Sequence, residues 1–138
     1  MPATTYTGNK IIDLLVRGVD FAPPARVYIA LHTADGGLTG SNEMTLAKWP
    51  GYKRLDIAQG AGVDTGFTAA ANKKTTNTKQ LLFAVMDGAA SVTITHWSIW
   101  DAQNGGNCLW TGALTYQKTL NPTDEVVVHV SELALEVD

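Results

Sequence analysis

Turn signals divide most of this chain into short apolar runs, and their spacing limits the fold more than any other feature. Clusters of glycine, proline, asparagine and aspartate recur roughly every 8–15 residues between runs rich in strand-forming residues. Parallel βαβ units require helices between strands, and this pattern offers none there. The sequence therefore predicts an all-β, antiparallel sandwich or barrel of about eight strands. The clearest runs are 27–31, 53–57, 81–85, 92–100, 126–130 and 133–137, with weaker strand character at Phe67 and 109–110 and a polar turn at 72–78.

The first 25 residues have a different pattern. Apolar residues recur there at three- and four-residue spacing, which predicts an amphipathic helix over 8–17. Thr7 is the expected N-cap, and Gly18 is free to adopt the left-handed conformation that ends a helix. So short a helix is unstable alone, so its apolar stripe must dock on something. The residues of the pattern are Ile11, Ile12, Leu14 and Leu15, with Val16 beside them.

Length and composition fit one globular domain, 1–138, with an N-terminal arm and helix over 1–25 and a sandwich over 26–138. Hydrophobic residues make up 45% and charged residues 17%, which excludes a disordered chain. A net charge of −3 argues against a nucleic-acid partner, because phosphate binding favours basic proteins. No apolar segment is long enough to span a membrane, and the N-terminus predicts no secretory signal.

Few residues have a spacing typical of catalysis or metal binding. His32, His96 and His129 have no second histidine or carboxylate at metal-ligand spacing, so we interpret them as structural. The single cysteine, Cys108, excludes an intrachain disulfide and has the setting of a small core residue with a high thiol pKa. Its pairing with His96 or His129 as a nucleophile has no support beyond the presence of these residues.

The polar segment after the first predicted strand offers two further weak signals. Its glycine-rich part, 36–40, lacks the Gly-Lys-Ser/Thr ending of a phosphate-binding loop. Asp35 and Glu43 are a formal carboxylate pair for glycoside hydrolysis, but lone loop carboxylates are more often solvated. We expect no catalytic residue, cofactor or metal. The alternative is a small hydrolase or lyase in which a histidine works with Asp35 or Glu43.

Four tryptophans stand out in a chain of this length. Trp97 and Trp100 have opposite parity in one predicted strand, so one faces the core and the other an outer face. The loop-to-strand junction holds further aromatic residues of the kind enriched at interfaces, and an aromatic sugar-binding platform is the rival interpretation. Our candidate partner contacts are Tyr6, Trp49, Pro50 and Tyr52.

The C-terminal run alternates in polarity. Leu133, Leu135 and Val137 are separated by Ala134 and Glu136. A period of two predicts a half-buried strand, with the three aliphatic side chains in the core and Glu136 pointing out.

Several segments, in order, resemble those of small tailed-bacteriophage virion proteins. The resemblance runs from Val27 to the end of the chain. It is strongest to the capsid cement (decoration) proteins of short-tailed phages, whose relatives are often labelled tail fibre proteins. The matching segments are Tyr28-Ile-Ala-Leu-His-Thr-Ala-Asp35, Gly51-Tyr-Lys-Arg54, Thr95-His-Trp-Ser-Ile-Trp-Asp101, Leu109-Trp-Thr-Gly-Ala-Leu114, Lys118-Thr-Leu and the closing strands over 126–137.

The resemblance implies a jelly-roll-type β-sandwich and a structural role without catalysis. A cement protein binds the major capsid protein on the outer surface of the head and stabilises contacts between subunits. We therefore expect a virion protein, made in the host cytoplasm, that also self-associates, with a two-fold dimer as the default and a trimer as the main alternative. The competing hypothesis is a tail-fibre or baseplate-associated structural or receptor-binding module.

Overall fold

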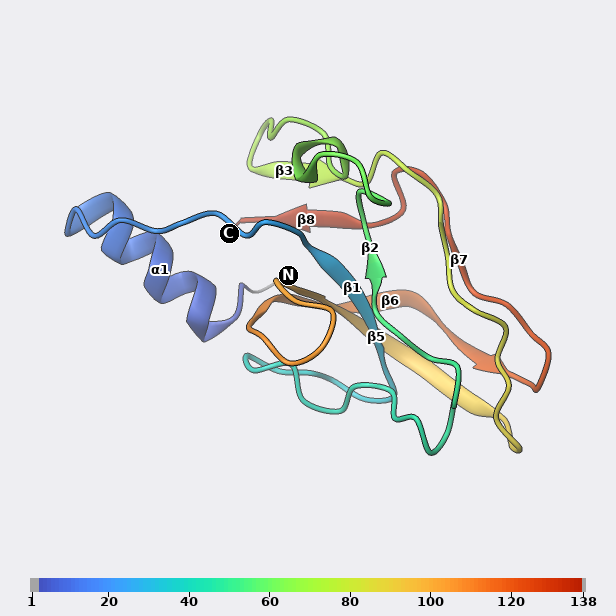
Figure 1. Cartoon of the computed structure of the whole chain (residues 1–138). Coiled ribbons are helices and arrows are strands. Elements are labelled where there is room, and N and C mark those ends of the chain that lie inside the picture. Colours follow the sequence, from blue (N-terminus) through green and yellow to red (C-terminus); the bar gives the residue numbers. More distant parts are fainter. Residues whose placement is uncertain (1–2, 138) are drawn as a thin grey trace.

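The computed structural model describes residues 3–137 and is mostly β-structure with one α-helix (Figure 1). No helix among these residues is long and apolar enough to cross a bilayer. The elements in chain order are α1 (Thr5–Val16), β1 (Tyr28–His32), β2 (Leu55–Asp56), the 3-10 helix η1 (Val63–Thr65), β3 (Lys74–Thr76), β4 (Leu81–Leu82), β5 (Val92–Trp100), β6 (Cys108–Leu120), β7 (Val127–Val128) and β8 (Ala134–Glu136).

The largest sheet has four antiparallel strands in the order β2-β1-β5-β6. Two further pairs, β3-β8 and β4-β7, join segments far apart in the sequence. The antiparallel, β-rich class with one short helix is therefore confirmed. The jelly-roll topology is not confirmed, because one four-stranded sheet packs with two short ribbons. Long stretches such as 33–54 satisfy their backbone groups in turns instead of ladders.

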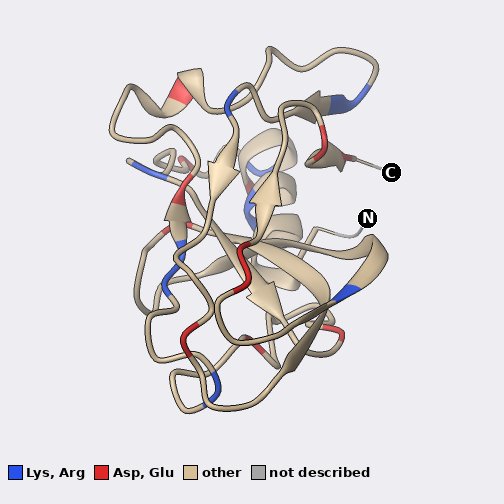
Figure 2. Cartoon of the chain, turned by 90° about the vertical axis from the view of Figure 1, so that its right-hand side faces the viewer, with Lys and Arg blue, Asp and Glu red and all other residues tan. Residues whose placement is uncertain are grey.

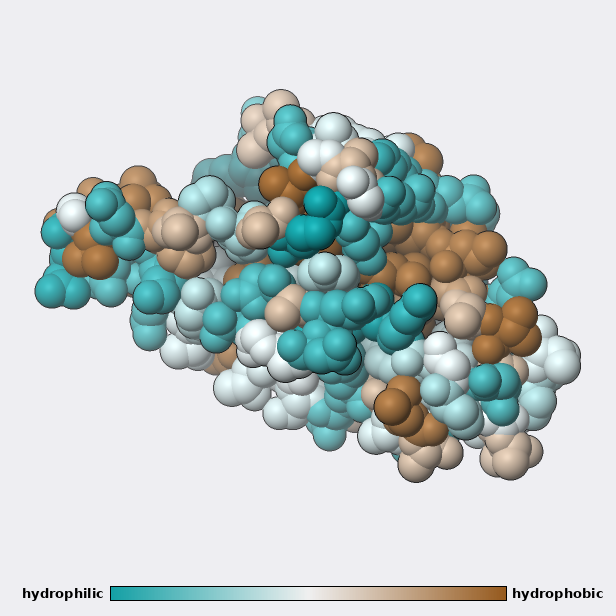
Figure 3. All heavy atoms as spheres, viewed as in Figure 1, coloured by the Kyte–Doolittle hydropathy of each residue, from teal (hydrophilic) through white to brown (hydrophobic). Residues whose placement is uncertain are grey.

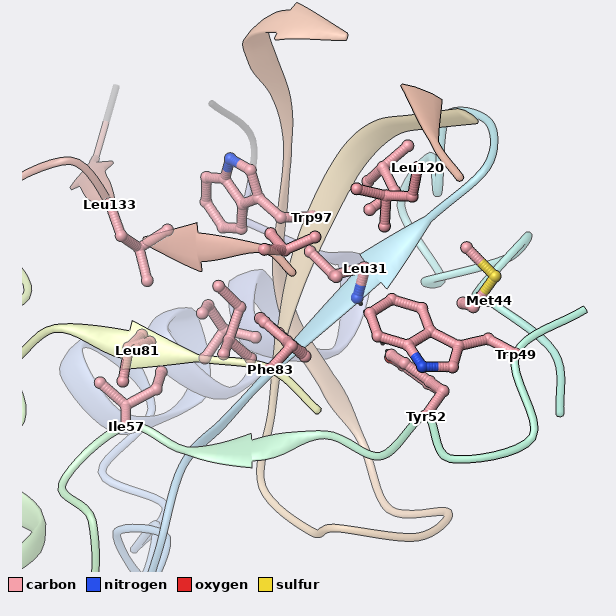
Figure 4. Packing of buried hydrophobic residues seen from close by; sticks show 14 of the residues in the cluster. Leu31, Met44, Trp49, Tyr52, Ile57, Leu81, Phe83, Trp97, Leu120 and Leu133 are labelled. Carbon is pink, nitrogen blue, oxygen red and sulfur yellow. Dashed lines mark hydrogen bonds between the residues drawn. The ribbon is translucent and has the colours of Figure 1, made fainter. Parts of the chain in front are cut away.

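The hydrophobic core lies between the four-stranded sheet and the two ribbons. Figure 4 shows Trp49, Tyr52 and Phe83 packed together beside Leu31 and Met44. The rings of Tyr52 and Phe83 stack with centroids 6.4 Å apart. Aromatic residues bury large areas, so this cluster fixes the 33–54 segment onto the sheet although that segment holds no strand.

Strand β6 carries a bulge of several residues. Ile94 pairs with Lys118, whereas His96 pairs with Ala113, so residues 114–117 lie opposite the single residue Thr95. The inserted residues have no partner in the ladder, and an insertion of this kind bends the strand that carries it. The bulge interrupts the outer edge of the sheet, which is otherwise formed by the longest strand of the protein.

The helix begins three residues earlier than predicted. Thr4, not Thr7, is the N-cap, and its hydroxyl accepts from the Thr7 amide. The Thr4 amide donates to the Leu109 carbonyl at 3.0 Å, so the start of the helix is fixed by β6. Gly18 follows the C-cap with φ 67°, as expected for a left-handed terminating residue.

Part of the predicted polar turn at 72–78 is a strand. Asn72 and Lys73 form the turn, with φ of 53° and 65°. The next three residues, Lys74–Thr76, pair with β8, and Thr75 lies opposite Leu135. The prediction missed this strand because its residues are polar and only their distant partner supplies apolar contacts.

The alternation of the C-terminal run is confirmed at two of its three aliphatic positions. Leu133 and Leu135 are 3% and 9% exposed. The prediction is wrong for Val137, which is 48% exposed, because β8 ends at Glu136 and its ribbon does not extend over the next residue. The Glu136 side chain lies outside and pairs with Lys74 at 3.7 Å.

We expect Leu135→Ala to lower the free energy of unfolding by about 2–5 kcal/mol, because it leaves a cavity in the core. The matched control Val137→Ala removes an exposed side chain and should change this free energy by less than about 0.5 kcal/mol. Urea denaturation followed by tryptophan fluorescence measures both. Equal effects of the two substitutions would contradict the facing of β8.

Candidate functional site

A buried arginine joins two loops at one end of the central sheet. Arg54 is 7% exposed, and its Nε and Nη2 donate to the two carboxylate oxygens of Glu43 at 3.0 and 2.8 Å. Its Nη1 donates to the carbonyls of Ala102 and Gly105 at 2.8 and 2.7 Å. The guanidinium lies 3.8 Å from the ring centroid of Trp100. Planar bidentate pairing and stacking are interactions that arginine makes and lysine does not.

Glu43 is held ionised by this cluster. Burial would raise the pKa of its carboxyl, but hydrogen bonds from Arg54 and Tyr52 outweigh burial, so the pKa lies below its ordinary value. The Tyr52 hydroxyl donates to Glu43 at 2.7 Å and accepts from the Leu31 amide at 3.1 Å. Burial, followed by the charge of Glu43, raises the pKa of Tyr52.

A directed chain of hydrogen bonds lies beside this cluster. His32 Nδ1 is 2.7 Å from the Ser41 carbonyl, which can only accept, so Nδ1 carries the proton. Nε2 then accepts from the Ser98 hydroxyl at 2.6 Å, and Ser98 Oγ accepts from Trp100 Nε1 at 2.6 Å. Burial lowers the pKa of His32 and outweighs the carbonyl of Ser41, which would raise it. His32 is therefore a neutral structural histidine.

The Ser98–His32 contact resembles the nucleophile and base of a hydrolase, but both side chains are buried away from solvent. Both residues are 0% exposed, and neither lines the cavity beside Leu114 and Tyr116 or the one beside Lys48 and Ser91. A substrate cannot reach Ser98 in this conformation. Of the residues considered for the hydrolase hypothesis, Glu43 pairs with Arg54 and Asp35 accepts from the Gly37 amide at 2.8 Å. That the protein is not an enzyme stays a prediction.

The remaining candidate groups are dispersed. His96 bonds the neighbouring Thr95 hydroxyl at 2.7 Å, and His129 is exposed. Cys108 is buried, and burial raises its pKa to about 11, as expected for an inert core thiol. Among residues 3–137, no three His, Cys, Asp or Glu side chains converge as metal ligands.

The tryptophans divide as the strand parity predicted. Trp97 is 5% exposed and belongs to the core, whereas Trp100 lies on the opposite face under Arg54. Trp49 and Tyr52 do not fit their expected role as partner contacts, because they are 0% and 8% exposed. Trp49 instead donates to the Val85 carbonyl at 3.1 Å from inside the core. Their aromatic character serves packing.

The other two candidate contacts retain surface. Pro50 is exposed, and Tyr6 is half-buried at the base of α1, 6.3 Å from the ring of Phe21. In the single chain described here, a partner can reach Pro50 and Tyr6 but not Trp49 or Tyr52. Whether Tyr6 and Pro50 contact a partner stays a prediction.

An apolar hollow opens beside the β6 bulge. It has a volume of about 350 Å³, and the exposed residues Lys118 and Glu132 border it. We call it the β6 hollow. Figure 3 shows apolar surface gathered here, between β6 and β7, and again on α1. The side chains that line the hollow include Ile94, Trp97, Leu114, Tyr116, Val128 and Leu133.

The apolar side of α1 faces solvent instead of the protein body. Figure 1 shows the helix projecting from the sheet, with the following segment running back along it. Ile12, Leu15 and Val16 are 57%, 75% and 75% exposed. With Gly8 and Ile11 they follow the i, i+3, i+4, i+7, i+8 spacing of a single helix face, which we call the arm stripe. The sequence predicted this amphipathic helix, but not that its stripe stays uncovered.

Leaving the arm stripe in water is unfavourable. Complete burial of a Val, Leu or Ile side chain contributes about 1.5–3 kcal/mol, so covering the exposed parts of Ile12, Leu15 and Val16 would contribute about 3–6 kcal/mol per copy. The polar side of the helix carries Lys10 beside the Asp13–Arg17 ion pair. Helices that lie on membranes typically have a side rich in lysine and arginine, which the polar side of this helix lacks.

Charges are mixed over the body of the protein. In the side view of Figure 2, acidic and basic residues are interspersed along the described chain. This arrangement differs from the single-sign stripe that phosphate backbones require.

We expect the buried neutral His32 to make stability depend on pH. The unfolded chain takes up a proton near pH 6.5, whereas the folded chain resists it to lower pH, so the free energy of unfolding should fall as pH drops below about 6.5. Urea titrations between pH 5 and 8 measure this slope. His32→Gln should flatten it, and the control His129→Gln at an exposed position should not. A slope that survives in His32→Gln would contradict the assignment.

The glycine-rich loop supplies a second prediction. Gly40 has φ 81°, and a Cβ there would lie 2.6 Å from Trp100 and 2.8 Å from Cys108. Gly40→Ala should therefore destabilise the fold by more than about 2 kcal/mol, through both clash and strain. Gly37→Ala, with φ 60° and open space around it, tests backbone strain alone. Equal thermal shifts for the two variants would contradict close packing of this loop.

Comparison with known proteins places the chain in a family. No curated protein matches the sequence. A family model described as "Podophage GP4 fiber I protein gp80" matches residues 2–136. This match supports the expected virion protein of a tailed phage, but it does not support the capsid cement type specifically. Because the match spans nearly the whole sequence, the chain belongs to the podophage GP4 fiber I protein gp80 family and is a structural virion protein of a tailed phage.

Proposed function

We propose that this protein is a structural subunit of a tail-fibre or baseplate-associated assembly on a podophage virion. It acts through protein–protein contacts and catalyses no reaction. The observation that carries the proposal is the family match over residues 2–136. That match names a fibre protein and so favours this hypothesis over the capsid cement hypothesis.

The geometry supports a role in assembly. The polar side chains of the types that often act in catalysis or binding, His32, Ser98 and Arg54, are buried. Their hydrogen bonds hold loops together. The surface instead offers an uncovered apolar helix face and an apolar hollow. Exposed apolar patches of this kind typically mark interaction sites.

Capsid cement is the second candidate, and the resemblance of the sequence segments from Val27 to the end favours it. In that case the partner is the major capsid protein, and the protein lies on the outer surface of the head. Both candidates are structural and involve repeated copies, so the location on the virion distinguishes them.

Labelling of intact virions tests the proposal. We expect immunogold particles against this protein at the tail, and virions lacking it should keep normal head stability to heat and osmotic shock. Heating of wild-type and deletion virions, followed by DNA release, measures that stability. Label over the whole head, together with heads that release DNA at lower temperature in the deletion, would reject the fibre proposal in favour of capsid cement.

A further inference from the structure

We propose that the arm stripe of one copy docks in the β6 hollow of a second copy, so that copies associate head to tail. The inference rests on the proposed function for its setting, because it describes how subunits of a structural assembly contact one another. It assigns a partner to two apolar surfaces that the single chain leaves exposed.

One chain cannot bring its own two surfaces together. The helix starts where Thr4 bonds the Cys108 and Leu109 carbonyls, at the first residues of β6. The hollow is bordered by residues 113–118, farther along the same strand. Figure 1 shows α1 pointing away from β7, on the opposite side of the sheet from that border. The stripe therefore meets a hollow only on another copy, in a heterologous contact.

The sizes of the two surfaces match. A cavity of about 150 Å³ holds a benzene-sized apolar group, so the 350 Å³ of the β6 hollow suits two large aliphatic side chains. Ile12 and Leu15 are three residues apart on the stripe, and so they project as neighbours from one helix face. A helix that inserts such anchors into an apolar groove is a common mode of recognition.

The charges around the two surfaces also agree with a second copy as the occupant. The arm stripe contains no charged residue. The hollow is bordered by one lysine and one glutamate, Lys118 and Glu132, whose opposite charges cancel. Copies of a chain with net charge −3 repel each other in general, and this contact adds no like-charge pair to that repulsion. Each copy also carries both surfaces, in equal number.

The contact is small, which fits repeated assembly better than a stable dimer. A helix of 12 residues is about 18 Å long, and only one face of it docks. That footprint is well below the ~800 Å² per partner of a stable interface. A heterologous contact leaves one free stripe and one free hollow, so it continues into a ring or filament. In such an array, many weak contacts act together.

Disulfide trapping with the full-length protein tests this contact. Leu15→Cys places a thiol on the stripe, and Tyr116→Cys places one beside the hollow. Both positions are exposed, at 75% and 81%, so the substitutions should leave folding intact, which thermal denaturation checks. The native Cys108 is buried and gives little background. The control pair combines Leu15→Cys with Ala70→Cys, an exposed position that does not line the hollow.

The two variants are mixed with a mild oxidant, and mixed disulfides are identified by mass spectrometry. We expect the Leu15–Tyr116 pair to form at least about tenfold faster than the control pair, because docking raises the local thiol concentration. A rate equal to the control overturns the proposal. Dominant Leu15–Leu15 disulfides also overturn it, since they indicate packing of helix against helix.

The trapping result does not depend on the location of the protein on the virion. Fast trapping combined with label over the head would reject the fibre function and keep the docking. Trapping at the control rate combined with label at the tail would reject the docking and keep the fibre function.

Discussion

The bidentate pair between Arg54 and Glu43 is the interaction on which the arrangement of the loops depends. An arginine that is 7% exposed tolerates burial only because its donors are occupied by Glu43 and two backbone carbonyls. Removing one partner of such a pair typically costs about 3–5 kcal/mol, because the other charge stays buried. Glu43 and Arg54 both lie in the 33–54 segment, and Arg54 Nη1 bonds two carbonyls of the turn between β5 and β6, so the cluster holds this turn against the segment just before β6 begins.

Strand β6 in turn positions both exposed apolar surfaces. Its first residues hold Thr4 and the start of α1, and its bulge at 114–117 shapes the hollow. A strand of 13 residues at a sheet edge would ordinarily be a template for pairing with another chain. Here the bulge interrupts its outer edge, and Ala3 occupies the edge at Trp110. Both features disfavour backbone pairing of another chain along this edge.

Local pattern predicted much of the fold and little of the candidate site. The opposite faces of Trp97 and Trp100 and the burial of Leu135 follow from a period of two, which needs no knowledge of the partner strand. The bounds of β5 follow from the turn signals on both sides of it. The β3–β8 pairing could not be predicted from the local pattern, because register between distant segments is set by tertiary packing. The burial of Trp49 also did not follow, since aromatic residues are favoured both in cores and at interfaces. For α1, periodicity gave the stripe but not the direction in which it faces.

The residues that carry the resemblance to virion proteins are mostly those that build the interior. The segment 51–54 supplies Tyr52 and Arg54, and 95–101 supplies Ser98 and Trp100, which bond or stack within the buried cluster. Similarity in such segments reports a shared way of packing loops onto the sheet. Helix α1 lies outside these segments, and it carries the exposed arm stripe. Attachment is decided by surfaces, so the resemblance of these interior segments supports a virion protein and carries less weight for its location on the virion. The family match, which includes the arm, is therefore the more informative comparison for location.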